Sequence, residues 1–328
     1  MKKYFNRSVL FFSCFVIIVS LCSWGFYVHE TATQIAVYQL PKHLRRFFFV
    51  NIDSLTTNAI RPDKRRSTDK GENPKHFIDI ENYGAIAMDS MPRNWQTAFK
   101  KYSFDTLKRY GYVPYQISIE YDSLVHAFKQ NKSDSIIFYA DDLAHYIEDA
   151  NVPLHTTNNY DGQLTNQKGL HALWESIIPE LEVNNYHLHS KHKATYIKDK
   201  PAAIWNAIKR AHDLLPEIFE KEKEVAKNFP DSSKYKTVMR YGRKTKVYTD
   251  AFAKQYAAAL GTTINEQVIN SANMVSDFWY SAWVDAGKPN LKKLYQFNKK
   301  DKRKPCKELK AYKKNRLLQN GLLRAKKE

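Results

Sequence analysis

Residues 145–155 read HYIEDANVPLH, a stretch in which two histidines and an aspartate lie close to a proline. Within a helix, His145 and Asp149 lie one turn apart on the same face, with Cβ atoms about 5–6 Å apart. Pro153 ends such a helix because its ring fixes φ and it has no amide hydrogen, so His155 follows after a turn of the chain. This spacing suits metal ligands, although a single H-x-x-x-D pair also occurs at ordinary helix ends.

A second pair of the same kind follows closely. After the polar loop TTNNYDGQLTNQKG the chain reads LHALWES, which places His171 and Glu175 four residues apart on another predicted helix. Together with His155, the two pairs bring five nitrogen and oxygen ligands into 31 residues. Imidazole and carboxylate groups are ligands that zinc accepts. The sequence therefore predicts a zinc site in this part of the chain.

The composition favours a helical fold. The chain has 328 residues, of which 43% are hydrophobic and 14% aromatic, which is enough to bury a sizeable core. Only 10 glycines occur, and apolar residues recur mostly at spacings of three and four, which favours helices over short strands joined by glycine turns. We expect a mainly α fold, a helical bundle forming one domain over about 24–297, with a charged loop at 61–75. The predicted helical segments cover residues 30–40, 43–59, 95–110, 115–130, 133–151, 201–229 and 251–286.

The N-terminal sequence MKKYFNRSVLFFSCFVIIVSLCS has the basic start and apolar stretch of a secretory signal peptide. We expect residues 1–23 to be removed between Ser23 and Trp24, and the protein to be exported to the periplasm or the exterior. The apolar character extends further, so an uncleaved membrane anchor over residues 9–28 is an alternative. Lipidation at Cys22 is a weaker alternative, because a large leucine precedes that cysteine.

The formal net charge of +18 is concentrated at the C-terminus. Residues 298–328 hold 13 Lys and Arg against 3 Asp and Glu, a net charge of +10. Such a basic tail would attract an anionic membrane or nucleic acid. A solvated, partly disordered end that only aids solubility is the alternative. We therefore place residues 298–328 outside the predicted domain.

Taken in order, the candidate ligands resemble those of a known family, the zinc-dependent phospholipases C and the related zinc-dependent single-strand nucleases. The shared pattern is an N-terminal Trp followed by His, then an Asp and a His from a loop region, then H-x-x-x-D-x-x-x-x-x-H, then H-x-x-x-E/D. In this sequence the pattern is carried by Trp24 and His29 in WGFYVH, Asp63 in RPDKRR, His76 in KHFID, His145, Asp149, His155, His171 and Glu175. The resemblance spans about residues 24–176.

The resemblance implies a mostly helical domain with a cleft that binds three zinc ions. Each zinc has its own set of expected ligands: Trp24 (amino nitrogen and carbonyl), His29 and Asp149; Asp63, His76 and His145, with Asp149 bridging; and His155, His171 and Glu175. Asp69 and Asp79 are alternatives to Asp63 in the same loop region. Asp79 is also predicted to orient His76 by hydrogen bonding.

The activity implied by the resemblance is phosphodiester hydrolysis, with Asp63 and Asp149 as catalytic residues. Two zinc ions about 3.5–4 Å apart can share a hydroxide that attacks phosphorus, while the third stabilises the leaving oxygen. The start WGFYVHETATQIA resembles the nucleases, whereas Glu175 and the short interval from His155 to His171 resemble the phospholipases. We favour a phospholipase C-like enzyme acting on phospholipid. The alternatives are a nuclease acting on single-stranded nucleic acid, or a non-catalytic, zinc-stabilised protein of the membrane surface; no protein partner is predicted.

Overall fold

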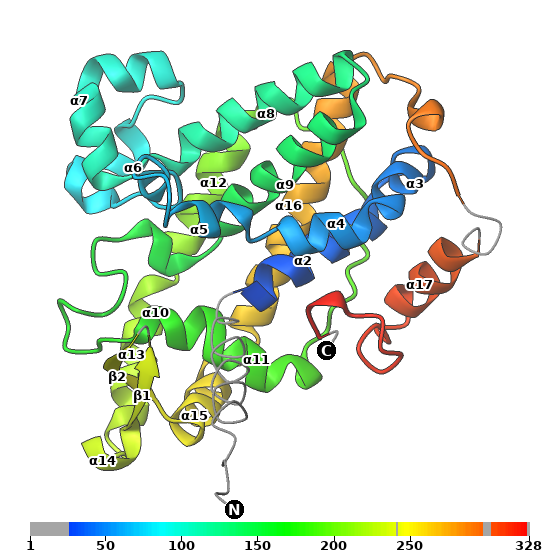
Figure 1. The fold of residues 1–328 in the computed structure, drawn as a ribbon. Coiled ribbons are helices and arrows are strands. Elements are labelled where there is room, and N and C mark those ends of the chain that lie inside the picture. Colours follow the sequence, from blue (N-terminus) through cyan, green and yellow to red (C-terminus); the bar gives the residue numbers. More distant parts are fainter. Residues whose placement is uncertain (1–25, 241, 298–302, 327–328) are drawn as a thin grey trace, which may run out of the picture.

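The computed structural model describes residues 26–240, 242–297 and 303–326 (Figure 1). Within these ranges the chain is mainly helical, as expected, and its sheet is a single antiparallel pair of strands. None of the described helices is both long enough and apolar enough to cross a bilayer. The predicted signal peptide, its cleavage site, the cysteine that could be lipidated and most of the alternative anchor lie outside the described residues.

The first half of the chain holds the helices that carry His29, Asp63, His145 and Asp149. They are α2 (Phe26–Gln39), α3 (Lys42–Val50), α4 (Ile52–Asn58), α5 (Arg61–Arg65), η1 (Asn73–Lys75), η2 (Ile80–Tyr83), α6 (Ala87–Ser90), α7 (Trp95–Tyr110), α8 (Val113–Lys129) and α9 (Ser133–Asp149).

The second half completes the bundle and adds the hairpin. Its elements are η3 (Pro153–Thr156), α10 (Leu170–Ala172), η4 (Leu173–Ile177), α11 (Ile178–Glu182), η5 (Val183–Asn185), α12 (Lys200–His212), α13 (Leu215–Ala226), α14 (Asp231–Lys234), β1 (Tyr235–Arg240), β2 (Arg243–Tyr248), α15 (Asp250–Leu260), α16 (Thr263–Asp285), η6 (Leu291–Lys293), α17 (Lys304–Lys313) and η7 (Arg324–Lys326).

The core forms where α2, α8, α9 and α16 pack together, with α16 running behind α2 and α9 in Figure 1. Trp279 of α16 is fully buried and ties three helices to one another. Its ring lies 4.6 Å from that of Phe48 on α3, between centroids, and its indole N–H donates to the carbonyl of Ala140 on α9 at 3.0 Å. This packing holds α9, which carries His145 and Asp149, in the centre of the molecule.

Three predicted helical segments are each divided between two helices, and a fourth, 95–110, is kinked at Ser103. Residues 43–59 break at Asn51 between α3 and α4. Within 201–229, α13 begins beside Pro216, whose missing amide hydrogen suits a first turn. Residues 251–286 break at Gly261, whose φ of 61° is tolerated because glycine has no side chain. The predicted loop 61–75 is in part wrong, since it contains α5 and η1.

The basic tail is in large part integrated into the fold. Tyr312 of α17 stacks on Tyr38 of α2, with centroids 5.0 Å apart, and the Tyr38 hydroxyl donates to Glu308 at 2.9 Å. Leu317 and Leu323 are buried in the main core. The prediction of a domain that ends near residue 297 is therefore wrong for residues 303–326. The many lysines of this segment led to the prediction of a solvated tail, although the segment also contains apolar side chains that are buried.

Candidate metal centre

The end of α9 is built as expected. Apolar residues face the core along this helix, and its last turn carries His145 and Asp149, both buried. Pro153 opens the short helix η3, and its missing amide hydrogen suits that first position. His155 follows on η3 and returns to the same interior, where its Nδ1 lies 3.4 Å from Asp149 Oδ1.

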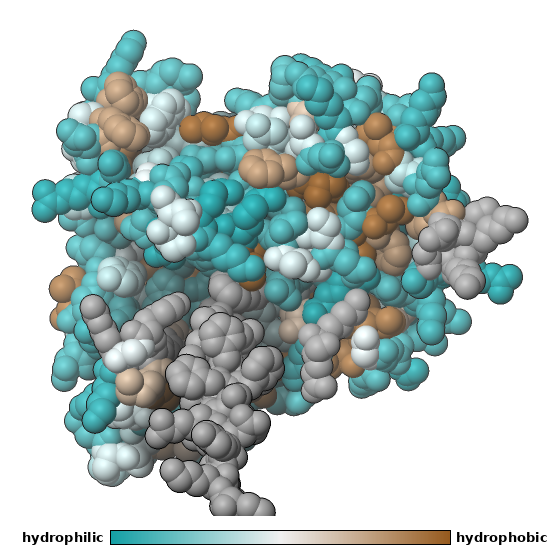
Figure 2. Space-filling view, viewed as in Figure 1, coloured by the Kyte–Doolittle hydropathy of each residue, from teal (hydrophilic) through white to brown (hydrophobic). Residues whose placement is uncertain are grey.

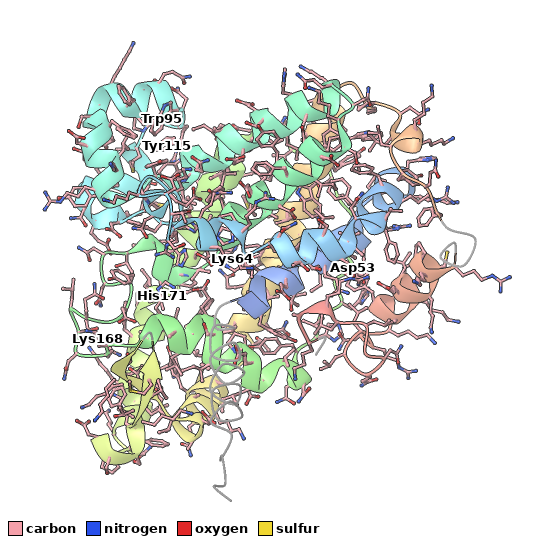
Figure 3. The ribbon with its side chains drawn as sticks, in the orientation of Figure 1. Asp53, Lys64, Trp95, Tyr115, Lys168 and His171 are labelled. Atoms are coloured by element: carbon pink, nitrogen blue, oxygen red, sulfur yellow. The ribbon has the colours of Figure 1, made fainter. Side chains whose placement is uncertain are left out.

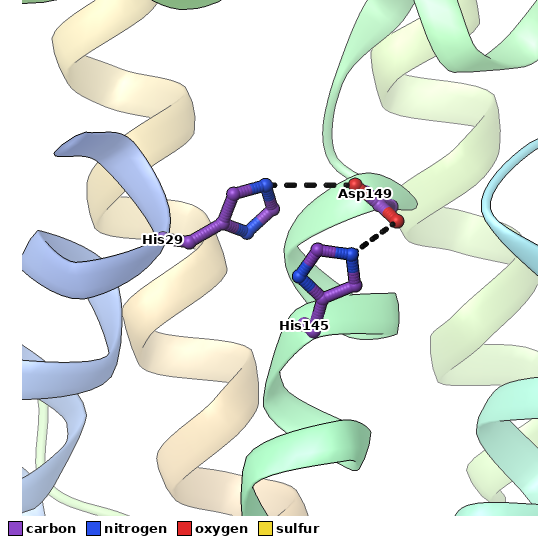
Figure 4. A group of neighbouring side chains, drawn as sticks. All are labelled: His29, His145 and Asp149. Carbon is purple, nitrogen blue, oxygen red and sulfur yellow. Dashed lines mark ion pairs between the residues drawn. The ribbon is translucent and has the colours of Figure 1, made fainter. Parts of the chain in front are cut away.

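The first ligand group joins α2 to α9. Figure 4 shows His29 from α2 and His145 from α9, both directed at the carboxylate of Asp149. His29 Nε2 lies 3.7 Å from Asp149 Oδ1, and His145 Nε2 lies 3.3 Å from Asp149 Oδ2. One ligand atom from each of the three side chains falls within 4.8 Å of the others. Trp24, the remaining predicted ligand here, precedes the described residues.

The second group contains Asp63, His76 and His145, again within 4.8 Å of one another. Asp63 Oδ1 lies 3.7 Å from His76 Nδ1 and 3.9 Å from His145 Nε2. Asp149 Oδ2 is 2.9 Å from His76 Nδ1, so this carboxylate also faces the second group. Among the acids of this loop region, the geometry selects Asp63 over Asp69 and Asp79.

The third group contains His155, His171 and Glu175. The Nε2 atoms of the two histidines are 3.2 Å apart, and Glu175 Oε2 is 2.6 Å from His171 Nε2. Glu175 lies in η4, a single π-helical turn, a form that is frequent at functional sites. Its other oxygen is 3.5 Å from His29 Nε2, so the third group adjoins the first.

In three histidines, a hydrogen bond donated by Nδ1 fixes which ring nitrogen carries the hydrogen. The Nδ1–H of His145 donates to the carbonyl of Ala59 and that of His155 to the carbonyl of His76, each at 2.8 Å. His29 Nδ1–H donates to Glu148 Oε2 at 2.7 Å. In the neutral ring the other nitrogen, Nε2, then carries a lone pair, and all three Nε2 atoms face the ligand groups.

The donor set fits zinc. Tetrahedral zinc with bonds of about 2.0–2.1 Å to nitrogen places neighbouring ligand atoms about 3.3–3.4 Å apart. The facing nitrogens of His145 and His76 are 3.0 Å apart, and those of His155 and His171 are 3.2 Å apart. Neutral imidazoles and carboxylates at these separations could hold metal ions, and the combination is compatible with zinc.

Opposite charges dominate the electrostatics of the centre. Burial by itself would raise the pKa of Asp149, but the neighbouring His145 and His155 charges hold it well below its usual range. Burial lowers the pKa of His155, yet the charge of Asp149, together with the hydrogen bond and the charge of Glu175, outweighs this and raises it to about 9. Asp149 and Glu175 are therefore ionised at neutral pH, and a metal must displace a proton from His155.

Two buried glutamates beside the ligands were missed in the sequence. Glu148 accepts hydrogen bonds from His29 and from the Thr33 hydroxyl at 2.9 Å. Glu72 Oε1 lies 3.5 Å from His76 Nε2, and this carboxylate also pairs with Arg65 at 3.1 Å. The spacing of four residues from Glu72 to His76 was the only local signal for this contact.

The prediction that Asp79 orients His76 is wrong, because the carboxylate that lies beside His76 Nε2 is that of Glu72. The backbone N–H of Asp79 donates to the carbonyl of Tyr110 at 2.8 Å, which fixes the chain just before η2. Burial, together with the charge of Glu81, raises the pKa of the Asp79 carboxyl to about 7. Asp79 thus belongs to the packing beside α7 and not to the ligand groups.

Comparison with known proteins found no match. No protein-family model matches the chain, and no curated protein is significantly similar to it. The resemblance to the zinc-dependent phospholipases C and single-strand nucleases therefore stays a prediction from the ligand pattern in the sequence.

Proposed function

We propose that the protein is an exported, zinc-dependent phosphodiester hydrolase of phospholipase C-like specificity, with three zinc ions held by the three ligand groups. The position of Asp149 carries this proposal. Its Oδ2 faces His76 and His145, while its Oδ1 faces His29 and His155. A carboxylate directed at two ligand groups can hold two metal ions as close neighbours, the arrangement that suits phosphodiester hydrolysis.

The roles of the chain's own residues follow from their burial. Zinc bound at these groups would supply Lewis acidity toward phosphate oxygens and acidify a water molecule. Asp149 is buried and lies between the first and second ligand groups, whereas the Asp63 side chain is 26% exposed. Asp63 is therefore the carboxylate of the second group that solvent can reach, and we assign it the orientation of the attacking water and acceptance of its proton.

Solvent reaches the centre on the side of the third group. The His171 side chain is 30% exposed, and Figure 3 shows this residue at the start of α10. Beside the chain that follows His155, an open pocket of about 570 Å³ is lined by Glu81, Thr157, Leu164 and Phe219, among others, but by none of the candidate ligands. Its mixed polar and apolar lining supports a substrate with a charged group and an apolar part, as a phospholipid has.

An assay of four substrates tests this proposal. The mature chain starting at Trp24 is expected to hydrolyse bis(p-nitrophenyl) phosphate and phosphatidylcholine, and to act less well on single-stranded DNA and RNA. Asp149→Asn should abolish turnover, whereas Asp134→Asn, an exposed aspartate on the same helix, should not. If the protein hydrolyses nucleic acid faster than phosphatidylcholine, its activity is that of a nuclease instead. Metal binding at all three groups with no turnover would assign the non-catalytic role.

A further inference from the structure

A cluster of three aromatic rings lies on α7. Ring centroids are 5.9 Å apart for Trp95 and Phe99, 6.4 Å for Trp95 and Phe104, and 6.3 Å for Phe99 and Phe104. Phe99 is 46% exposed and Phe104 44% exposed, although both are large apolar side chains. Figure 2 shows hydrophobic atoms over the α7 region at the upper left, surrounded by hydrophilic ones. We call Trp95, Phe99 and Phe104 the α7 aromatic cluster.

A kink in α7 creates this cluster. On a continuous helix, residues five apart point about 140° away from each other, so Phe99 and Phe104 would not meet. Ser103 between them has φ 61° and ψ 161°, a backbone conformation that residues other than glycine rarely adopt. Its hydroxyl oxygen accepts the backbone N–H of Thr106 at 3.4 Å and caps the second helical segment. The strained serine therefore turns both phenylalanines toward the same side.

Basic residues border the α7 aromatic cluster. Lys100 directly follows Phe99, and Lys108 lies one turn beyond Phe104 on the same face of its helical segment. Both lysines are exposed, and neither makes an ion pair with any residue that the structure describes. Residues 93–110 hold five Lys and Arg against one Asp, a net charge of +4. This face of α7 thus combines exposed apolar rings with positive charge.

We propose that this face of α7 docks the protein on an anionic phospholipid surface. Exposed aromatic rings enter the boundary between headgroups and acyl chains, while lysines keep their ammonium groups at the level of the phosphates. Single-stranded nucleic acid would need open ring faces for base stacking. Here the three rings pack on one another, which favours the lipid surface. The inference deepens the proposed function, on which it rests, by naming membrane phospholipid as the substrate class.

Docking through α7 fixes the metal centre relative to the membrane. The chain leaving α7 is hydrogen-bonded to the segment that carries His76. The backbone N–H of Asp79 donates to the carbonyl of Tyr110, and the N–H of Tyr112 donates to the carbonyl of Pro74, each at 2.8 Å. Gly111 has φ 81°, and a Cβ there would collide with the carbonyl oxygen of Phe77. Since the two segments approach so closely, a membrane held at α7 has a defined distance to His76.

Vesicle flotation tests the apolar contribution. The mature full-length chain should bind vesicles of phosphatidylcholine with phosphatidylserine more tightly than phosphatidylcholine alone. The double variant Phe99→Ser/Phe104→Ser should bind the mixed vesicles about tenfold or more weakly. Met239→Ser is the matched control, because Met239 is 53% exposed on β1, away from α7. Its vesicle binding should equal that of the unmodified protein.

Two double variants test the contribution of the lysines to vesicle binding. Lys100→Glu/Lys108→Glu should remove the preference for phosphatidylserine, whereas Lys223→Glu/Lys227→Glu, with the same charge change on and just after α13, should keep it. Turnover of soluble bis(p-nitrophenyl) phosphate should be unchanged in both pairs. Failure of the unmodified protein to bind vesicles, or loss of single-stranded DNA binding with vesicle binding kept in the α7 variants, would overturn the docking proposal. Absence of turnover in the unmodified protein would instead overturn the proposed function.

Discussion

Glu148 accepts the Nδ1–H of His29 at 2.7 Å, and both side chains are buried, at 1% and 2% exposure. This bond connects α9 to α2 and leaves Nε2 of His29 directed at the first ligand group. The carboxylate thereby controls the tautomer of a ligand that it does not itself join. Neighbours of this kind raise the basicity of an imidazole ligand and hold its orientation.

The first prediction concerns this bond. Glu148→Gln should weaken metal binding at the first group by roughly 10–100-fold, because a neutral amide orients His29 less firmly. Competition with a fluorescent zinc chelator measures the change. Thr33→Val, which removes only the 2.9 Å hydroxyl bond to Glu148, is the control and should have a smaller effect. Equal affinities for Glu148→Gln and the unmodified protein would contradict the role given to Glu148.

The second prediction separates the three groups by metal content. Asp149→Asn should lose metal from two groups at once, because its two carboxylate oxygens face different histidines. His171→Ala should empty only the third group, whose other ligands are His155 and Glu175. Inductively coupled plasma mass spectrometry of the purified variants gives the stoichiometries. Three zinc ions bound to Asp149→Asn would show that this carboxylate is not the bridge.

The third prediction concerns pH. The pKa of His155 is raised to about 9 by Asp149 and Glu175, so the metal-free ring is protonated at neutral pH. Zinc must displace that proton, and apparent affinity should therefore fall about tenfold per pH unit as pH drops below 9. Zinc titrations between about pH 6 and 9 measure the slope. A flat profile over this range would show that His155 is already neutral when zinc arrives.

The fourth prediction concerns the C-terminal segment. Arg324, 8% exposed, donates to Glu308 at 2.9 Å and to Asp53 at 2.6 Å. Arg324→Ala should lower the free energy of unfolding by about 3 kcal/mol, because it leaves the charge of Glu308 buried and unpaired. Arg316→Ala, an exposed arginine of the same segment, should change it by less than about 0.5 kcal/mol. Urea unfolding compares the two; equal stabilities would place residues 303–326 outside the cooperative unit.

The fifth prediction concerns the N-terminus. If Trp24 supplies its amino nitrogen to zinc, that nitrogen must be free, and its ordinary pKa near about 7.7–8.0 lets a metal displace its proton at neutral pH. One extra residue before Trp24 should therefore lower zinc content at the first group, which would keep His29 and Asp149. Intact-mass measurement of the exported protein checks where the chain begins. Full zinc content in the extended protein would remove the Trp24 amine from the ligand set.

The sequence alone determined the helical class and the ligand pairs of α9 and α10–η4. Both depend on local physics, since helical spacing places residues four apart on one face whatever the rest of the chain does. The spacing of His145 from Asp149, and of His171 from Glu175, is therefore enough to pair them. The turn at Pro153 that returns His155 to the interior was equally local.

The tertiary structure decided what depends on distant contacts. Asp63 and His76 meet His145 only because α5 and the chain after η1 pack against α9, so the choice of Asp63 over Asp69 and Asp79 needed the fold. Glu72 replaces Asp79 beside His76 for the same reason. The lysine-rich tail has the composition of a solvated end, yet Tyr312, Leu317 and Leu323 are buried against helices from the start of the chain. Burial of a few apolar side chains against distant helices holds this segment in the fold despite its local excess of charge. Periodicity along the chain carries no information about such long-range contacts.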